Sequence, residues 1–201
     1  MLQGSRSVME GLYTYITQLQ LPTDIQEKLD PWRKSLKKEI DVFSVPKIRP
    51  HITLMRMTCH RDDEDAIVED LKKISHEPIK IEGTHLEKIS RSSVAIMIKE
   101  TDAIHTLHEK IANVFSERMA RPPGHVPPEY QDRIEDFQKY GSPFFGEHYK
   151  PHLTIGYTGG TFPEDISLPF PIEWETKRFK VCKKLDQSGK PYQDVVTISF
   201  N

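Results

Sequence analysis

The chain has 201 residues, of which 36% are hydrophobic and 29% are charged, and its formal net charge is −2. This length supports one sizeable core or two small lobes that share one. The near-neutral charge argues against a disordered chain and against a strongly basic nucleic-acid-binding protein, although a balanced total can hide a basic cleft. Two cysteines, Cys59 and Cys182, provide no disulfide framework and indicate a reducing, cytoplasmic setting. The apolar runs are too short to cross a membrane.

The first part of the chain predicts a strand followed by a helix. Residues 1–10 lack an apolar core of signal-peptide length, and we expect a flexible leader or an expression remnant outside the fold. Residues 11–21 are rich in aromatic and β-branched side chains, which predicts a strand that ends at Pro22. Thr23 is the expected N-cap of a helix that reaches Ile40, with apolar residues three or four positions apart.

The middle of the chain alternates between strand and helix patterns. Residues 45–57 predict a strand that is entered through two prolines, Pro46 and Pro50. Residues 61–74 begin acidic and end basic, which matches the dipole of a helix. Residues 79–89 and 92–100 predict two more strands, and an apolar stripe over 101–115 predicts the next helix.

Residues 120–149 differ from the rest of the chain and are predicted to form an insertion. They contain five prolines and six aromatic residues, too many for a simple linker, and the segment is too long for an ordinary connection. After it, residues 151–158, 178–185 and 194–200 predict strands, the last two joined by a turn at 187–189. Helices that alternate with strands and hairpins favour an α+β fold with antiparallel or mixed sheets.

One six-residue phrase occurs twice, as RPHITL at 49–54 and KPHLTI at 150–155. In each copy a cation, Pro, His, an aliphatic residue, Thr and an aliphatic residue follow one another on a predicted strand. Because strand residues two apart share a face, each histidine projects with the threonine that follows it. The aliphatic residues point to the other face, where helices can cover them. Each copy therefore predicts a strand with one polar face and one anchoring face.

Two such faces fit the acid–base cleavage of a phosphodiester. One group must take a proton from the nucleophile and another must give one to the departing oxygen, and histidine suits both tasks near neutral pH. We therefore predict His51 and His152 as the catalytic pair. The hydroxyls of Thr53 and Thr154 can donate to the non-bridging phosphate oxygens. The alternative is that both copies are half-buried strands with satisfied polar residues.

The sequence resembles the 2H phosphoesterase superfamily. This group includes bacterial 2′-5′ RNA ligase-like proteins, RNA 2′,3′-cyclic phosphodiesterases and viral 2′-5′ oligoadenylate phosphodiesterases. It is defined by two His-x-[Thr/Ser] motifs with hydrophobic flanks, here His51-Ile52-Thr53 and His152-Leu153-Thr154. The resemblance covers residues 11–201, and the insertion at 120–149 is its main departure from the family pattern.

The resemblance implies a single bilobal α+β domain over residues 11–201. Two antiparallel or mixed sheets with flanking helices would be related by pseudo-two-fold symmetry, with the active-site cleft between them and one motif from each. It also implies a hydrolase that needs no metal and no other cofactor. The expected substrate is an RNA end, a short oligonucleotide or a small nucleotide, and the expected protein is a monomer without membrane association.

The implied reaction is the opening of a 2′,3′-cyclic phosphate to a monoester. One alternative is cleavage of a 2′-5′ oligoadenylate or a cyclic oligonucleotide signal. Another is a nucleotide- or RNA-binding module that is not catalytic, and a third is a scaffold in which both motifs are only structural. Symmetry-related motifs do not indicate which histidine is the base.

Residues next to the motifs are further candidates for substrate binding. Arg49 and Lys150 precede each histidine by two residues and share its face if the strand continues through the proline; the alternative is a pair of solvated cations at the strand ends. We also place Tyr157 at the site, where it would stack on a base or simply pack. Strand alternation places Met55 on the site face and Arg56 away from it.

The insertion supplies Tyr149 as another candidate for substrate binding. With Arg121, Arg133 and Lys139, its aromatic residues could form a lid that stacks bases, or they could pin the loop to one lobe. His148 and His152 are four residues apart, but Pro151 argues against the helix that a zinc pair would need, so no metal site is expected. His105 and His108 are predicted to be surface residues of the helix over 101–115.

Overall fold

A computed structural model describes residues 11–40, 43–45, 49–90, 92–120, 128–142, 144–163, 166–184 and 192–200. The leader at 1–10, the turn at 187–189 and the first part of the insertion, 121–127, lie outside the described residues. Among the described helices, none combines the length and the apolar character needed to cross a bilayer.

Nine strands form one strongly curved sheet in the order β7-β4-β5-β6-β3-β1-β8-β9, and β2 pairs with β6 outside this path. All the recorded strand pairs are antiparallel. The strands are β1 (Leu12–Gln20), β2 (Phe43–Ser44), β3 (His51–His60), β4 (Ile79–Lys88), β5 (Ser93–Ile98), β6 (His152–Thr158), β7 (Glu173–Thr176), β8 (Arg178–Lys184) and β9 (Gln193–Ser199).

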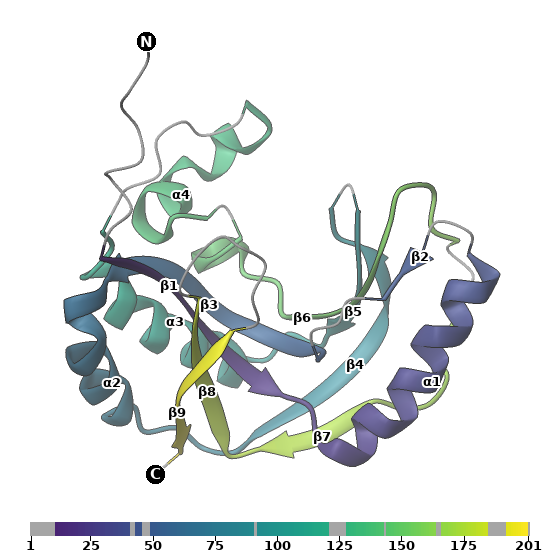
Figure 1. Cartoon of the computed structure of the whole chain (residues 1–201), viewed down its shortest axis with the longest axis horizontal. Coiled ribbons are helices and arrows are strands. Elements are labelled where there is room, and N and C mark those ends of the chain that lie inside the picture. The colour runs from purple at the N-terminus through teal and green to yellow at the C-terminus, as the bar shows by residue number, and fades with distance from the viewer. Residues whose placement is uncertain are drawn as a thin grey trace.

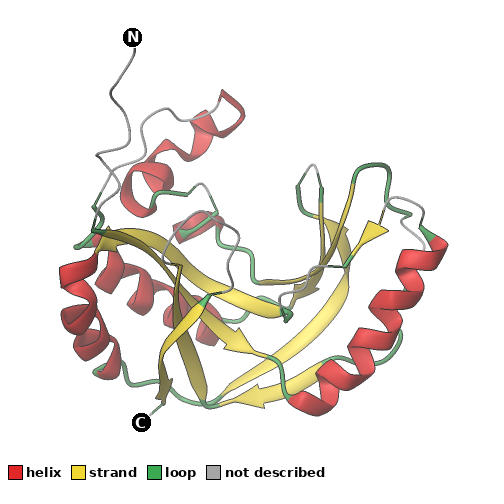
Figure 2. Ribbon diagram, viewed as in Figure 1, coloured by secondary structure: helices red, strands yellow, loops and turns green. Residues whose placement is uncertain are grey.

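The helices lie around the curved sheet (Figures 1 and 2). Helix α1 runs along one flank and α2 and α3 lie at the other, whereas α4 stands at the rim of the open side. Their bounds are α1 (Thr23–Glu39), α2 (Glu64–Lys72), α3 (Asp102–Ser116) and α4 (Ile134–Tyr140), and short 3₁₀ turns occur at Arg61–Asp63, Pro128–Arg133 and Gly146–His148.

The structure confirms the α+β class and joins the two expected sheets into one. The junction is the β3–β6 contact, which is recorded at a single residue pair, Ile52 opposite Leu153. Four strands of the main path lie on each side of this junction, an arrangement consistent with pseudo-two-fold symmetry. Each lobe therefore brings one motif strand to the centre of the sheet.

Among the local features that differ from the sequence predictions are the start of α1, the strand β7 and the position of His108. Thr23 is the first residue of α1, and Pro22 occupies the N-cap without a side-chain hydrogen bond. Strand β7 was not predicted, because its four residues follow a proline-rich passage. His108 is fully buried instead of lying on the surface of α3, since it faces the sheet along with the apolar stripe of that helix.

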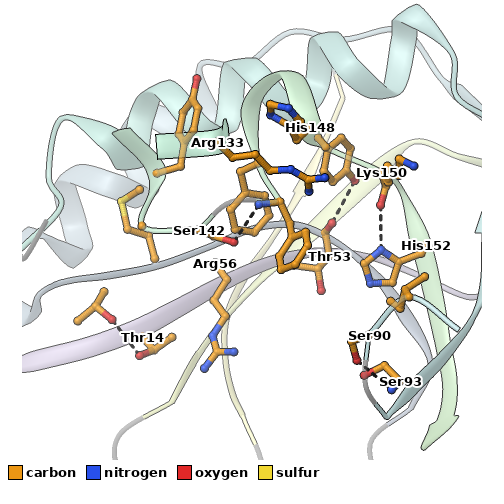
Figure 3. Close-up of a pocket in the computed structure, with 18 of the residues that line it drawn as sticks. Thr14, Thr53, Arg56, Ser90, Ser93, Arg133, Ser142, His148, Lys150 and His152 are labelled. Atoms are coloured by element: carbon orange, nitrogen blue, oxygen red, sulfur yellow. Dashed lines mark hydrogen bonds between the residues drawn. The ribbon is translucent and has the colours of Figure 1, made fainter. Parts of the chain in front are cut away.

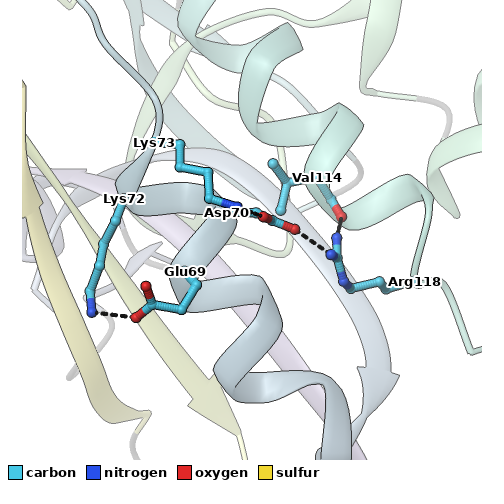
Figure 4. Close-up of polar contacts among 6 residues, drawn as sticks. All are labelled: Glu69, Asp70, Lys72, Lys73, Val114 and Arg118. Carbon is cyan, nitrogen blue, oxygen red and sulfur yellow. Dashed lines mark hydrogen bonds and ion pairs between the residues drawn. The ribbon is translucent and has the colours of Figure 1, made fainter.

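Charged residues fix the outer helices to each other. Asp70 on α2 accepts a hydrogen bond from Lys73 at 2.6 Å and from Arg118, which follows the end of α3 (Figure 4). The Arg118 guanidinium also donates to the Val114 carbonyl at 2.8 Å. These bonds hold the pKa of Asp70 below its ordinary value, and the bond from Lys73 has the largest effect. The end of α3, from which the insertion departs, is thereby anchored on α2.

The aliphatic residues of both motifs occupy the core, as predicted. Ile52, Leu54, Leu153 and Ile155 are all 0% exposed. Full burial of such a side chain stabilises the folded state by roughly 1.5–3 kcal/mol. The same packing that holds the two motif strands therefore turns their polar residues to the other face.

Gly156 on β6 offers a test of the packing of β2. A Cβ at this position would come within 2.0 Å of the Phe43 ring, which is buried, whereas a Cβ at Gly159 would meet nothing within 4 Å. We expect Gly156→Ala to lower the free energy of unfolding by about 1–3 kcal/mol, because the ring must move. Urea denaturation measures the change, and Gly159→Ala is the matched control. Equal stability of the two variants would contradict the close approach of Phe43 to β6.

Candidate active site

The two motifs meet where β3 and β6 are neighbours. With Ile52 opposite Leu153, the antiparallel register sets Thr53 across from His152 and His51 across from Thr154. Residues that are diagonal in such a ladder are roughly 7–8 Å apart, a spacing that side chains can bridge through one small group. The register therefore brings all four predicted residues together on one face of the sheet, where each is half-buried.

Both imidazoles are held in the same way by the backbone. His51 Nδ1 lies 2.9 Å from the Arg49 carbonyl, and His152 Nδ1 lies 2.8 Å from the Lys150 carbonyl. Because a carbonyl only accepts, each Nδ1 carries the hydrogen. Each Nε2 is left as the atom that can take or give a proton (Figure 3 shows the bond between His152 and Lys150). The residues expected to supply cationic side chains thus also fix the histidine tautomers.

The two histidines differ in their electrostatic surroundings. Burial is the main cause that lowers the pKa of each ring, and the bond to the backbone carbonyl opposes it. The charge of His152 lowers the pKa of His51 further, whereas the carboxylate of Glu87 on β4 raises the pKa of His152. The charge of Glu87 therefore favours a proton on His152, whereas the neighbouring ring disfavours a proton on His51.

A β-bulge follows each motif at the same place. Thr53 and Met55 pair with successive residues of β1, so Leu54 is the extra residue on β3. Thr154 and Gly156 pair with successive residues of β5, so Ile155 is extra on β6. Each bulge residue lies three positions after its histidine. Bulges bend a strand and interrupt the alternation of its side chains.

A buried polar side chain from a helix bonds to the carbonyl of each bulge residue. His108 Nδ1 on α3 donates to the Leu54 carbonyl at 2.7 Å, and Arg33 Nε on α1 donates to the Ile155 carbonyl at 2.8 Å. His108 is 0% exposed and Arg33 is 2% exposed. A carbonyl that leaves the ladder needs such a partner when it is buried. The two bonds hold the strands in the bent form that presents the motifs.

Because of the first bulge, two residues lie on the opposite faces of the sheet from those predicted. Met55 is fully buried, and Arg56 is exposed and lines the cleft beside Thr53. Strand alternation predicted the reverse, because no local pattern indicates the extra residue. Tyr157 stands at the equivalent position after the second bulge and is 42% exposed. It is not among the residues that line the cleft.

The cleft has a volume of about 920 Å³, within the range of pockets for small ligands. Strands β1 and β3 form one part of its surface, the β4–β5 turn another, and the insertion a third (Figure 3). Polar and charged residues that line it include Thr14, Thr53, Arg56, Thr58, Glu87, Ser90, Ser93, Arg133, Ser142, His148, Lys150 and His152. Three are Arg or Lys and one is a carboxylate, so the lining favours an anionic ligand.

The four motif residues differ in their relation to this cleft. Thr53 and His152 line it, whereas His51 and Thr154 are outside its lining. The β3–β6 register still sets His51 diagonally across from His152 on the same face of the sheet. The motif site therefore lies at the border of the cleft, and the cleft extends from it towards the insertion.

The insertion is anchored through His108. The ring of His108 is stacked on Tyr149, with centroids 4.0 Å apart, and on Phe145 at 5.7 Å. His108 Nε2 accepts a hydrogen bond of 3.0 Å from the Gly146 backbone N–H. The Tyr149 hydroxyl donates to the Thr53 carbonyl at 3.0 Å, and the residue is 2% exposed. Tyr149, expected to bind substrate, lines the cleft and also supports the first motif through this bond.

Of the other cleft residues, Lys150 was predicted from the sequence, whereas His148 and Glu87 were not. His148 lies in the wall of the cleft, and its Nδ1 is 2.5 Å from Asp136 Oδ2. Lys150 also lines the cleft, whereas Arg49 is exposed at the start of β3 and does not. Glu87 reaches the cleft from β4. Within the described residues there is no group of three metal-ligating side chains.

Comparisons with known proteins identify a family and several similar folds. The 2′-5′ RNA ligase superfamily matches residues 21–185. E. coli LigT in complex with ATP has a similar structure, with a TM-score of 0.69, 14% identity, and coverage of 94% of this chain and 98% of that one. TT0787 of Thermus thermophilus gives a TM-score of 0.67 at 14% identity, with coverage of 93% and 97%. No curated protein sequence matches the chain.

The fold and the paired motifs thus define a phosphoesterase- or ligase-type protein. The chain belongs to the 2′-5′ RNA ligase superfamily, the 2H phosphoesterases, which confirms the resemblance of the sequence. At 14% identity, the similarity to these solved structures concerns the fold.

The buried His108 predicts a loss of stability in acid. Burial lowers its pKa from the usual 6.5 to about 4, so the unfolded chain takes up the proton first as the pH falls. The contribution of the neutral ring to the free energy of unfolding is fully present above pH 6.5. It is lost as the pH falls from 6.5 to 4, by at most about 3 kcal/mol. Urea denaturation at pH 7 and pH 4 should show a smaller difference for His108→Gln than for the wild type.

The matched control for this prediction is Arg33→Met. It removes the equivalent bond on the other lobe but no group that titrates in this range, so it should lower stability similarly at both pH values. An unchanged pH dependence in His108→Gln would contradict the assignment of His108 as a buried neutral ring.

Proposed function

We propose that the protein is a metal-independent phosphodiesterase that opens 2′,3′-cyclic phosphates of RNA ends or nucleotides. The observation that carries this proposal is the β3–β6 register, which sets two imidazoles with tied Nδ1 atoms diagonally across one site. A phosphate between them would have one Nε2 on each side. Such a pair is sufficient for acid–base cleavage when one ring is neutral and the other protonated.

The charges around the pair favour one assignment of the roles. His51, whose pKa is lowered by burial and by the neighbouring ring, is the base. Its Nε2 takes a proton from water as the water oxygen bonds to phosphorus. The bond from phosphorus to one ribose oxygen breaks, and His152 Nε2 gives its proton to that oxygen. Water and the cyclic phosphate together yield one phosphate monoester, and solvent restores both rings.

The remaining polar groups stabilise the negative charge of the reacting phosphate. The hydroxyls of Thr53 and Thr154 share the face of the histidines and can donate to its non-bridging oxygens. Arg56 adds a full positive charge close to Thr53. Its planar guanidinium can bind two phosphate oxygens at once. Arg56 therefore joins the predicted phosphate-binding residues.

The ligands of similar proteins support a nucleotide substrate. Crystal structures of E. coli LigT hold 3′-AMP, ATP or NADP⁺. A nucleoside 3′-phosphate is one of the two monoesters that opening of a 2′,3′-cyclic phosphate can yield. The other reactions open to the same site, cleavage of 2′-5′ oligoadenylates or of cyclic oligonucleotides, use the same two histidines and are distinguished by assay.

Replacement of either histidine should abolish hydrolysis. We expect His51→Ala and His152→Ala each to reduce the rate by about 10²–10⁴-fold, because each removes one proton transfer. The assay compares 2′,3′-cyclic nucleotides, RNA with a cyclic-phosphate end, 2′-5′ and 3′-5′ oligoadenylates and cyclic oligonucleotides, all in EDTA. Circular dichroism checks that both variants remain folded, and His60→Ala, an exposed histidine outside the cleft lining, is the control. Wild-type protein that cleaves no member of the panel would contradict the proposal.

The role of Glu87 can be tested through the pH dependence of the rate. Its carboxylate raises the pKa of His152, so Glu87→Gln should lower that pKa. Since the acid must be protonated, the alkaline limb of the profile should move to lower pH while the acid limb, set by His51, stays. Glu82→Gln on the same strand is the control. A shift of the acid limb instead would reverse the assignment of acid and base.

A further inference from the structure

Four aromatic residues of the insertion fall into two groups with different surroundings. Tyr140, Phe145 and Tyr149 are at most 7% exposed and pack around His108. Phe144 is 42% exposed. Core packing accounts for the first group. A single exposed apolar side chain is common and indicates nothing by itself, so the position of Phe144 decides what it means.

Phe144 lies on the wall of the cleft that contains Thr53 and His152. Its neighbours in the chain hold it there: Phe145 is buried in the lobe, and the Phe144 backbone N–H donates to Ser142 Oγ at 3.3 Å. Gly146, which follows Phe145, has a φ of +69° and donates its backbone N–H to His108. The ring is thus presented by a segment that is fixed to the core, on the side of the cleft formed by the insertion.

A cation accompanies the ring. The Arg133 guanidinium carbon lies 5.9 Å from the centroid of Phe144, within the range of a cation–π contact. Arg133 also lines the cleft and extends towards His148 and Lys150 in Figure 3. An aromatic face and a guanidinium plane are the two surfaces on which proteins stack nucleobases.

We propose that Phe144 and Arg133 form a nucleobase subsite that the insertion adds to the cleft. The inference rests on the proposed function for the position of the phosphate, between the histidines and Thr53. A cleft of about 920 Å³ holds far more than a phosphate group. A nucleotide whose phosphate is bound at the motifs extends its base across this space to the insertion. The subsite then makes the protein prefer substrates that carry a base over bare sugar phosphates.

The test compares adenosine 3′-phosphate with ribose 3-phosphate, which has a hydroxyl in place of the base, by isothermal titration calorimetry. Stacking on an aromatic side chain is worth roughly a 5- to 100-fold gain in affinity. We expect the wild type to bind the nucleotide more tightly by such a factor. Phe144→Ala should lose most of this preference while its affinity for ribose 3-phosphate is unchanged, and Phe144→Tyr should keep it.

The control variant is Ile134→Ala. Ile134 is another exposed apolar residue of the insertion, 38% exposed, and does not line the cleft. It should bind both ligands like the wild type. Equal affinities of the wild type for both ligands, or an equal loss for both in Phe144→Ala, would overturn the subsite.

The outcomes also separate this inference from the proposed function. A preference for the base that depends on Phe144, without hydrolysis of any member of the panel, would retain the subsite and remove the catalytic proposal. Hydrolysis that depends on both histidines, with no effect of Phe144→Ala on binding or on KM, would retain the catalytic proposal and remove the subsite.

Discussion

Two hydrogen bonds to buried backbone carbonyls hold the candidate site in shape. The Leu54 and Ile155 carbonyls leave the sheet ladder at the two bulges, and His108 and Arg33 donate to them from opposite helices. An unsatisfied carbonyl in this position would cost roughly 1–3 kcal/mol, so each strand keeps its bulge only while its partner is in place. Each bond also reaches the motif directly, because the bulge residue follows the motif threonine. The geometry of both motifs is therefore set by residues far away in the chain, one on each covering helix.

The residue His108 also joins the insertion to the motif-bearing face, an arrangement found in one lobe only of the described residues. His108 bonds to the Leu54 carbonyl through one ring nitrogen and to the Gly146 N–H through the other, with Tyr149 and Phe145 stacked on its faces. Both bonds require the neutral ring, since a protonated His108 would have no acceptor for Gly146. A fully buried ring with a low pKa meets that requirement at neutral pH. The position of the insertion is thereby coupled to the first motif.

The sequence was sufficient to predict the elements that depend on local pattern. The repeated phrase predicted the four central residues, and the 2- and 3.6-residue periodicities predicted most strands and helices. The face of the sheet on which Arg56 lies could not be predicted. It depends on a bulge, and a bulge depends on how β3 pairs with β1, which the sequence of a single strand does not show. His108 was misplaced for a related reason: its polar side chain on a helix indicated the surface, and its burial depends on the Leu54 carbonyl and the Gly146 N–H, both distant in the sequence. Glu87 reaches the cleft through tertiary packing alone, whereas the sequence had already indicated the aromatic residues of the insertion, Phe144 among them, as one alternative for a base-stacking lid.

The backbone of the site is nearly symmetric, but its side chains are not. Arg56 and Tyr157 stand five residues after their histidines, one cationic and one aromatic. Glu87 raises the pKa of His152, and among the described residues no carboxylate acts on His51 in the same way. Symmetric chemistry would let either histidine serve as acid, so a substrate could bind in two directions with equal result. The unequal charges remove that equivalence, since they favour a proton on His152 and place the positive charge of Arg56 beside Thr53. The insertion, present in one lobe, reinforces the same direction by offering a stacking surface at one end of the cleft.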